Sequence, residues 1–291
     1  MSSSRRLRLA SFFALACAVL SGGALAAPEV QAGPAAWTRG EAANVVADGA
    51  LVVHAVVPLC DNDQIDCGST KAGEPENLEH NLYWGAVFGH KRFFGRKASA
   101  YRLVSTTRAE KGVLERAVYR RSVSGKPFGR EGDIEVVVVL DAIAGGSIDG
   151  AVDALFRMAE RGGAVAFRDG EADRRLRVDV AVYAGHNRMM DGKMAAAALA
   201  DDDERRAPIP AVILACDSRS YFREPLEARG SYPVVLTRDL MAPEGYVLEA
   251  AVEGLARNEP RQTIRKRVVA AYAKWQRIEE KTAGSIFANL D

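Results

Sequence analysis

The sequence predicts an α/β fold, a three-layer sandwich with a mostly parallel central sheet. Short, continuously apolar runs recur along the chain, as expected of strands that are covered on both faces. Segments with the spacing of amphipathic helices lie between several of these runs, and this alternation is typical of parallel sheets. The 291 residues carry a formal net charge of only +1, which suits a globular chain. We therefore expect a single α/β domain over residues 46–291.

The composition excludes several classes of protein. With 48% hydrophobic residues and no long repeat, the chain is neither disordered nor collagen-like nor a coiled coil. Its charge is too evenly balanced for a nucleic-acid binder, which carries a basic stripe. No segment beyond the first 26 residues is apolar enough to span a membrane. We expect no nucleic-acid partner and no stable membrane span after the signal peptide is cleaved.

Residues 1–26 have the pattern of a secretory signal peptide. A basic start precedes an apolar run over 9–20, and Ala24-Leu25-Ala26 supplies the small residues of a cleavage site. Twin-arginine export and a lipid-attachment site at Cys17 are weaker alternatives, because neither pattern is complete. We expect a periplasmic or secreted protein of bacterial type, with a loose lead-in rich in Ala, Gly and Pro over 27–45.

The first predicted strand covers residues 51–58, which are almost continuously apolar. A mixed aromatic and small-residue segment over 81–90 is predicted as a short helix. Residues 100–105 and 113–123 are predicted to pair as a hairpin. The run over 134–140 is again continuously apolar and predicts a strand with both faces covered.

Apolar residues at helical spacing predict a helix over 147–161. Ser147 or Asp149 is placed to cap its start, and Gly162 to end it. Three further strands are predicted at 178–184, 209–215 and 234–237, and two helices at 245–257 and 261–281. Five apolar residues share one face of the last helix: Ile264, Val268, Tyr272, Trp275 and Ile278.

The cysteines beyond the signal peptide divide into a pair and a single residue. Cys60 and Cys67 lie in one polar turn, where an oxidising compartment allows a disulfide. Three aspartates in that turn suggest calcium, but Ile65 occupies a ligand position and no Gly follows, so a solvated, disulfide-closed loop fits better. Zinc spacings and nucleotide-binding motifs are absent from the sequence, and we expect no metal and no cofactor. Cys216 remains unpaired, either as a buried thiol or as a reactive one.

Chemically active residues follow the predicted strands at one edge of the sheet. His186 follows the strand at 178–184, and Cys216 follows the strand at 209–215. Ligands of open α/β sheets bind beyond the carboxyl ends of the strands, and neighbouring strands lie about 4.8 Å apart. A cysteine nucleophile requires a nearby base, which His186 would provide. Alternatively, the two residues are an inert pair in the core.

The two strand ends resemble those of caspase-like cysteine peptidases, the group that includes clostripain, gingipain and legumain. The resemblance is carried by an apolar strand ending in His over 178–186 and an apolar strand ending in Ala-Cys over 211–216. It implies a caspase-like fold, with His186 as the base and Cys216 as the nucleophile. Backbone N–H groups near both residues, at Asn187 and Cys216, would form the oxyanion hole.

The chain departs from this family at Asn187, where the family usually has Gly. Asn tolerates a positive φ better than most residues, so the backbone shape is expected to survive. The chain is also similar to an uncharacterised group of exported bacterial proteins with this fold. This similarity indicates the fold rather than a function. That similarity lies in residues 81–85, 183–186, 214–216, 220–222 and 240–244.

Other residues at this edge are candidates for a substrate pocket. Asp61, Asp141 and Asp217 follow three of the strands and would favour a basic substrate side chain. Tyr83, Trp84, Met241 and Glu244 would shape the pocket. Alternatively, the two aromatic residues pack in the core, and Glu244 with Pro243 only begins a helix.

Two functional hypotheses follow. The first is an exported caspase-like cysteine hydrolase, a peptidase acting on peptides or proteins through His186 and Cys216. In such enzymes the connection between the two strands, here with acidic and basic residues over 201–206, is either a solvated loop or a processing site. The second hypothesis is a non-catalytic periplasmic binding or scaffold protein that keeps the fold, in which the Cys216 thiol is inert. The sequence does not specify an oligomeric state.

Overall fold

The computed structural model describes residues 36–37, 45–108, 112–192, 194–196 and 207–290. The predicted signal peptide and the segment 201–206 lie outside the described residues. Of the predicted lead-in, Trp37 is described and is fully buried, and its Nε1–H donates to the Leu255 carbonyl oxygen at 3.1 Å. This tryptophan is therefore anchored to the domain, in contrast to the loose segment expected from composition.

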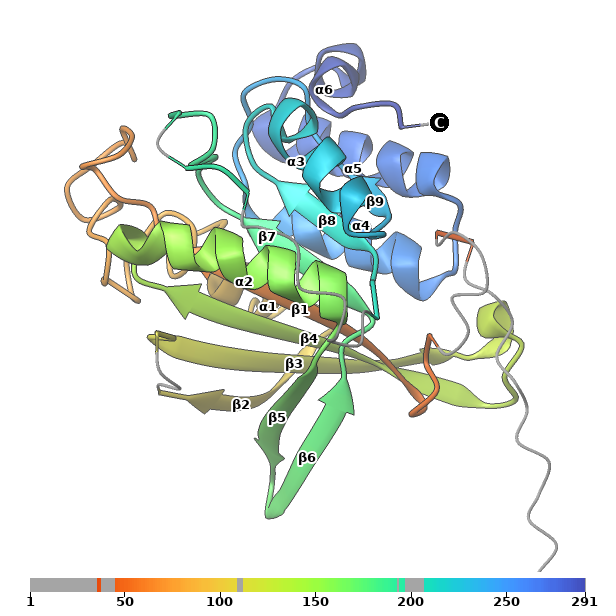
Figure 1. Ribbon diagram of the computed structural model, residues 1–291. Coiled ribbons are helices and arrows are strands. Elements are labelled where there is room, and N and C mark those ends of the chain that lie inside the picture. Colours follow the sequence, from red (N-terminus) through yellow and green to blue (C-terminus); the bar gives the residue numbers. More distant parts are fainter. Residues whose placement is uncertain (1–35, 38–44, 109–111, 193, 197–206, 291) are drawn as a thin grey trace, which may run out of the picture. The chain divides into compact units, whose positions relative to one another are not determined.

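A seven-stranded sheet forms the centre of the fold (Figure 1), with strand order β2-β3-β4-β1-β7-β8-β9. The neighbouring strands from β4 to β9 run parallel, and the β2–β3 hairpin adds an antiparallel edge. The prediction of an α/β fold with a mostly parallel sheet is confirmed. The strands are β1 (Ala50–Pro58), β2 (Arg102–Thr107), β3 (Glu115–Ser124), β4 (Asp133–Ile143), β7 (Val180–Ala184), β8 (Ala211–Leu214) and β9 (Pro233–Val235).

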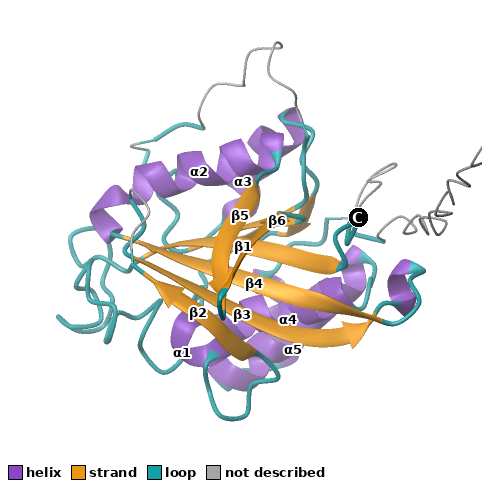
Figure 2. Ribbon diagram, turned by 90° about the horizontal axis from the view of Figure 1, so that it is seen from below, coloured by secondary structure: helices purple, strands orange, loops and turns teal. Residues whose placement is uncertain are grey.

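Helices cover both faces of this sheet (Figure 2), an arrangement compatible with a three-layer sandwich. Apolar residues of α2 and α3 pack on one face, and those of α1, α4 and α5 pack on the other. A separate hairpin of β5 and β6 projects from the α2 side. Its strands are β5 (Ala164–Asp169) and β6 (Ala172–Arg177). The helices are α1 (His90–Phe94), α2 (Ile148–Arg161), α3 (Ser218–Ala228), α4 (Gly245–Ala256), α5 (Arg261–Gln276) and α6 (Glu280–Ile286).

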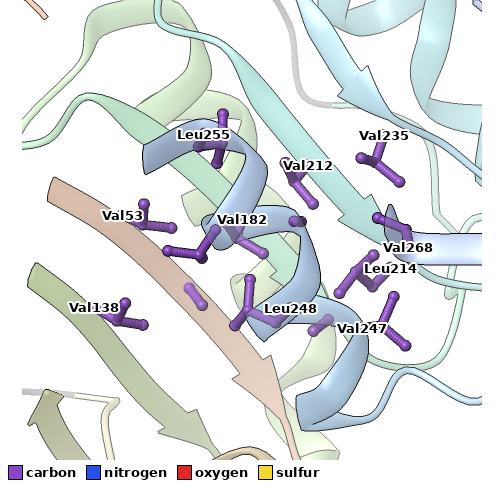
Figure 3. Packing of buried hydrophobic residues seen from close by; sticks show 14 of the residues in the cluster. Val53, Val138, Val182, Val212, Leu214, Val235, Val247, Leu248, Leu255 and Val268 are labelled. Carbon is purple, nitrogen blue, oxygen red and sulfur yellow. The ribbon is translucent and has the colours of Figure 1, made fainter. Parts of the chain in front are cut away.

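The central strands are buried on both faces, which explains their continuous apolar sequence. Successive side chains of a strand face opposite sides of the sheet. In β1, Val53 belongs to the apolar cluster under α4 and α5, whereas Val56 belongs to the cluster under α2. Figure 3 shows Val53 among the residues packed with Leu248 and Leu255 of α4. Burial of such side chains stabilises each by about 1.5–3 kcal/mol relative to exposure.

Several predicted elements are confirmed. The hairpin of β2 and β3 is antiparallel as expected. Helix α2 begins after Ser147, whose side chain makes no capping hydrogen bond, and ends at Gly162 with φ at 68°. A positive φ at this position favours glycine because a side chain would be strained there.

Two predicted helices differ from the structure. The segment 81–90 forms turns, and α1 begins only at His90. A Cβ at Gly85 would lie 2.2 Å from the Glu79 carbonyl oxygen, so only glycine fits where the chain approaches itself in these turns. The predicted helix over 261–281 divides into α5 and α6, because Arg277 adopts a left-handed conformation with φ at 56°.

The β5–β6 hairpin and α3 were not predicted from the sequence, and β4 is longer than predicted. The β5–β6 hairpin is rich in arginine and alternates exposed with buried positions rather than forming an apolar run. Helix α3 contains Pro225 and buries few large side chains, mainly Phe222 and Leu226. Strand β4 continues to Ile143, past the end of its apolar run. Among the described helices, none has the length and apolar character needed to cross a membrane.

Candidate active site

The carboxyl ends of β7 and β8 carry the two residues predicted to do chemistry. These strands are parallel, and Ala184 pairs with Leu214. His186 and Cys216 each follow this pair by two residues, so the register brings them to the same edge of the sheet. Both line one cleft of about 590 Å³. We call it the Cys216 cleft.

The walls of the Cys216 cleft come from loops that are distant in sequence. The disulfide loop contributes Ile65 and Asp66, and the segment before α4 contributes Leu240 and Met241. Leu240 is 64% exposed, an unusual degree for a leucine, and lies at this cleft. The other lining residues are Leu82, Tyr83, Gly185, Met190, Asp191, Ala242, Pro243 and Tyr272.

Cys216 is a free cysteine, and its side chain is half-buried. Its Sγ–H donates to the Met241 carbonyl oxygen at 3.5 Å, and Sγ accepts the Met241 N–H at 3.4 Å. Burial raises the pKa of the thiol, and the nearby carboxylates of Asp239 and Asp217 raise it further, whereas the Met241 N–H opposes them. The surroundings of Cys216 therefore favour the protonated thiol over the thiolate in the free protein.

His186 is held by Asp191, an aspartate that is not among the predicted site residues. Its Nε2 lies 2.9 Å from Oδ2 of Asp191. Burial by itself would raise the pKa of Asp191, but hydrogen bonds from His186 and Arg188 keep it below its usual value. Asp191 is therefore an ionised partner that orients the imidazole. The clue in the sequence was local, since Asp191 lies five residues after His186 in the same loop.

His186 and Cys216 are not joined by a hydrogen bond in the described part of the chain. Their loops are instead tied together by Asn187, which is fully buried. Its Nδ2–H donates to the Cys216 carbonyl oxygen at 2.6 Å, and its Oδ1 accepts the Met190 N–H at 3.2 Å. Asn187 thus fixes the distance between the two loops.

The backbone conformation differs from the expectation at Asn187. A positive φ was expected there, but the residue with the left-handed conformation is Asp217, with φ at 42°. Asp217 directly follows Cys216 and precedes α3, so the strained residue allows the sharp turn from strand to helix. Ser218 and Thr237 hold this turn through mutual backbone and side-chain hydrogen bonds.

The predicted pocket residues divide between the cleft and the core. Tyr83 and Met241 line the Cys216 cleft. Trp84 is fully buried away from it, and its Nε1–H donates to Glu115 at 2.8 Å. Glu244 is also buried outside the cleft lining, precedes α4, and accepts a hydrogen bond from Gln276 at 3.0 Å. For Trp84 and Glu244, packing and helix initiation are the better interpretation.

The three aspartates predicted to select a basic side chain do not line the cleft. Asp61 accepts the Asp63 N–H at 2.9 Å and stabilises its own turn. Asp141 lies inside β4 because this strand is longer than its apolar run, and its side chain is bound by Arg116. Asp217 accepts a hydrogen bond from the Ser220 hydroxyl at 2.8 Å. The carboxylates that do line the cleft are those of Asp66 and Asp191.

The predicted disulfide is present. Cys60 and Cys67 are bonded, with their Cα atoms 6.1 Å apart. The loop they close carries Ile65 and Asp66 to the rim of the cleft. Across the residues that the structure describes, no cluster of His, Cys, Asp and Glu is arranged to hold a metal ion.

Comparisons with protein-family models, curated proteins and solved structures found no match to this chain.

Proposed function

We propose that this protein is an exported, caspase-like cysteine hydrolase that cleaves peptide bonds. The observation that carries the proposal is the position of a free thiol and an imidazole in one cleft, at the ends of adjacent parallel strands. The half-buried Cys216 is unpaired although Cys60 and Cys67 are oxidised. The disulfide accords with an oxidising compartment, in which a retained free thiol suggests a chemical role.

In the proposed reaction, Cys216 is the nucleophile and His186 is the base. The imidazole takes the thiol proton as Sγ bonds to the substrate carbonyl carbon, which gives a tetrahedral oxyanion. The C–N bond then breaks, the leaving amine takes the proton from His186, and a thioester remains on Cys216. Water hydrolyses the thioester with help from the same imidazole, which releases the acid and restores the thiol. No cofactor takes part in these steps.

Asp191 determines which nitrogen of His186 serves as the base. A neutral imidazole has one N–H donor and one acceptor nitrogen. Because Nε2 lies 2.9 Å from the ionised carboxylate of Asp191, it carries the proton. Nδ1 is then the nitrogen that accepts the thiol proton. Asp191 acts as a positioning residue, as the third member of other nucleophilic triads does.

Backbone N–H groups are available to stabilise the oxyanion. Asn187 and Cys216 are the residues assigned to this role by the family resemblance, and neither N–H group donates to a backbone carbonyl oxygen in the described part of the chain. Helix α3 begins at Ser218, directly after the nucleophile's turn, so its amino-terminal dipole also favours negative charge near Cys216. Removing one oxyanion donor in such sites typically costs on the order of 100-fold in rate.

In the resting state the thiol is hydrogen-bonded to the Met241 backbone, and its raised pKa disfavours the thiolate, so activation accompanies substrate binding. A substrate in the cleft displaces Sγ from the Met241 backbone and lets it approach His186. Hydrogen bonds of catalytic groups are often absent without substrate and form in the complex.

The second candidate function is a non-catalytic periplasmic binding or scaffold protein. The observation that favours it is the same resting state, because a thiol with a raised pKa and no hydrogen bond to a base resembles an inert buried cysteine. In that case the cleft binds a peptide or protein segment without cleaving it.

The test is cleavage of a peptide library by the purified mature protein, followed by mass spectrometry. We expect discrete cleavage products that disappear in Cys216→Ala and decrease on the order of 100-fold or more in His186→Ala. His80→Ala is the matched control, since His80 is exposed and outside the cleft lining, and it should cleave normally. Library peptides that bind but remain intact would support the scaffold function instead.

A further inference from the structure

A second cleft lies on the opposite side of the central strands from α4 and α5, between α2 and the sheet. It has a volume of about 530 Å³ and shares no lining residue with the Cys216 cleft. We call it the His54 cleft. One face of α2 forms a wall, and the other lining residues belong to β1, β4, the turn before β5 and the segments that precede β3, α2 and β7. Ligand sites in proteins are typically apolar hollows of about 300–1,000 Å³ with a few placed polar groups.

A buried network of polar side chains forms the floor of the His54 cleft. Arg116 donates from Nε and Nη2 to the two carboxylate oxygens of Asp141, at 2.7 and 2.8 Å. Nε2 of His54 lies 2.7 Å from the same carboxylate. These hydrogen bonds hold the pKa of Asp141 at about 2, although burial opposes them, so the carboxylate is ionised.

This network determines what His54 offers to the cleft. An ionised carboxylate only accepts hydrogen bonds, so Nε2 of His54 is the protonated nitrogen in the neutral ring and Nδ1 is an acceptor. Nδ1 has no hydrogen-bond partner among the described residues, and the His54 side chain is 13% exposed at the cleft. The neighbouring residues in β4 and β7 are Val139 and Ala181, so apolar residues flank His54 on both sides within the sheet.

The first property that a ligand must match is the acceptor nitrogen of His54, and the second is the charge on the walls of the His54 cleft. Asp141 is neutralised by Arg116, while Arg157 of α2 adds positive charge to the lining. Arg157 is exposed and makes no ion pair with any residue that the structure describes. The remaining walls are mainly apolar, with Val56, Val113, Ile143, Ala151, Ala154, Met158 and Val178 among them.

We propose that the His54 cleft binds a small amphiphilic carboxylate that also carries a hydroxyl group. The carboxylate pairs with Arg157, the apolar body lies along α2, and the hydroxyl donates to Nδ1 of His54. Charge complementarity favours this class, because the guanidinium of Arg157 attracts a carboxylate and the mainly apolar walls favour an apolar body over a small anion. The site is independent of the Cys216 cleft.

The experiment is calorimetric titration of the whole mature protein with 3-hydroxydecanoate. We expect saturable binding with one ligand per chain and an increase in thermal stability. Decanoate, which lacks the hydroxyl, should bind several-fold more weakly, and the uncharged decane-1,3-diol should bind at least tenfold more weakly. Cys216→Ala should bind normally.

Two variants locate the site. Arg157→Gln should weaken binding about tenfold, since it removes a charge-assisted contact from an exposed position without disturbing the fold. Arg219→Gln is the matched control, because Arg219 is exposed on α3 and absent from the cleft lining. Ala154→Phe fills the groove and should abolish binding. The proposal is overturned if 3-hydroxydecanoate does not bind, if Arg157→Gln binds as well as Arg219→Gln, or if the diol binds as tightly as the acid.

Discussion

The two clefts differ in how their polar groups are held. In the His54 cleft, the side chains of His54, Asp141 and Arg116 project from inside strands and are bound to one another at 2.7–2.8 Å. In the Cys216 cleft, His186 and Cys216 lie on loops just beyond two strands, and each is bound to a different partner. Strand residues are fixed by the register of the sheet, whereas loop residues keep the freedom to move toward a substrate.

Because their polar groups are held differently, we expect the His54 cleft to matter for the stability of the fold and the Cys216 cleft for its reactivity. Removal of one member of a buried ionic network destabilises the fold, because it leaves a buried charge without its partner. In the Cys216 cleft, burial raises the pKa of the Cys216 thiol, and Asp191 orients the base, His186. We expect this arrangement to contribute little to stability. We therefore expect substitutions in the His54 cleft to affect unfolding, and substitutions in the Cys216 cleft to affect chemistry.

Asp141→Ala should have the largest effect on stability. It leaves the buried guanidinium of Arg116 without a carboxylate, which costs about 3–5 kcal/mol. Urea unfolding at neutral pH measures the loss. Asp133→Ala, at the exposed start of the same strand, is the control and should change stability by less than about 0.5 kcal/mol. Equal losses of unfolding free energy in Asp141→Ala and Asp133→Ala would contradict the structural role given to the buried network of the His54 cleft.

Acid should reduce the contribution of Asp141 to the free energy of unfolding in a defined pH range. Because the pKa of Asp141 is lowered from 3.8 to about 2 in the folded protein, its contribution is present above the unfolded pKa. That contribution, about 2 kcal/mol, is lost as the pH falls from about 4 to about 2. Urea unfolding across this range should show a steeper decline for the native chain than for Asp141→Asn. Parallel curves would contradict the assignment.

Asp191→Asn should affect activity far more than stability. The substitution removes the ionised partner of His186, and misorientation of the base is expected to lower the cleavage rate on the order of 100-fold. The side chain of Asp191 is 23% exposed, so the free energy of unfolding should change by less than about 1 kcal/mol. Asp149→Asn is the matched control, because Asp149 shares Arg188 with Asp191 but does not contact His186. Equal rates for the two variants would exclude Asp191 as a positioning residue.

The sequence predicted the parts of the fold that depend on local pattern. Continuous apolar runs located β1, β4 and β7, and the strand-end rule located His186 and Cys216 in one cleft. The predicted end of β4 was wrong because a charged Asp141 interrupts the apolar run. Its strand position depends on Arg116, a partner 25 residues away that lies opposite in β3. No local pattern reveals such a partner.

The same reason explains why residue spacing assigns no role to His54. Its partner, Asp141, is 87 residues away and becomes adjacent only through the parallel pairing of β1 and β4. Asn187 was noted for its backbone, but its buried side chain proved to be the structural link between the loops. Such side-chain contacts depend on tertiary packing, which residue spacing does not encode.

The central claim, that Cys216 and His186 act together when a substrate binds, is tested most directly by comparing two alkylating reagents. Iodoacetamide measures the thiol of the free protein, whereas a mixed set of peptidyl acyloxymethyl ketones enters the cleft as a substrate does. We expect slow iodoacetamide labelling with an apparent pKa above the usual range, because burial raises the pKa of Cys216. We expect much faster labelling by the peptidyl reagents, which His186→Ala abolishes and His80→Ala leaves intact. Peptidyl labelling that is no faster than iodoacetamide labelling and is indifferent to His186 would contradict the account and favour the scaffold function.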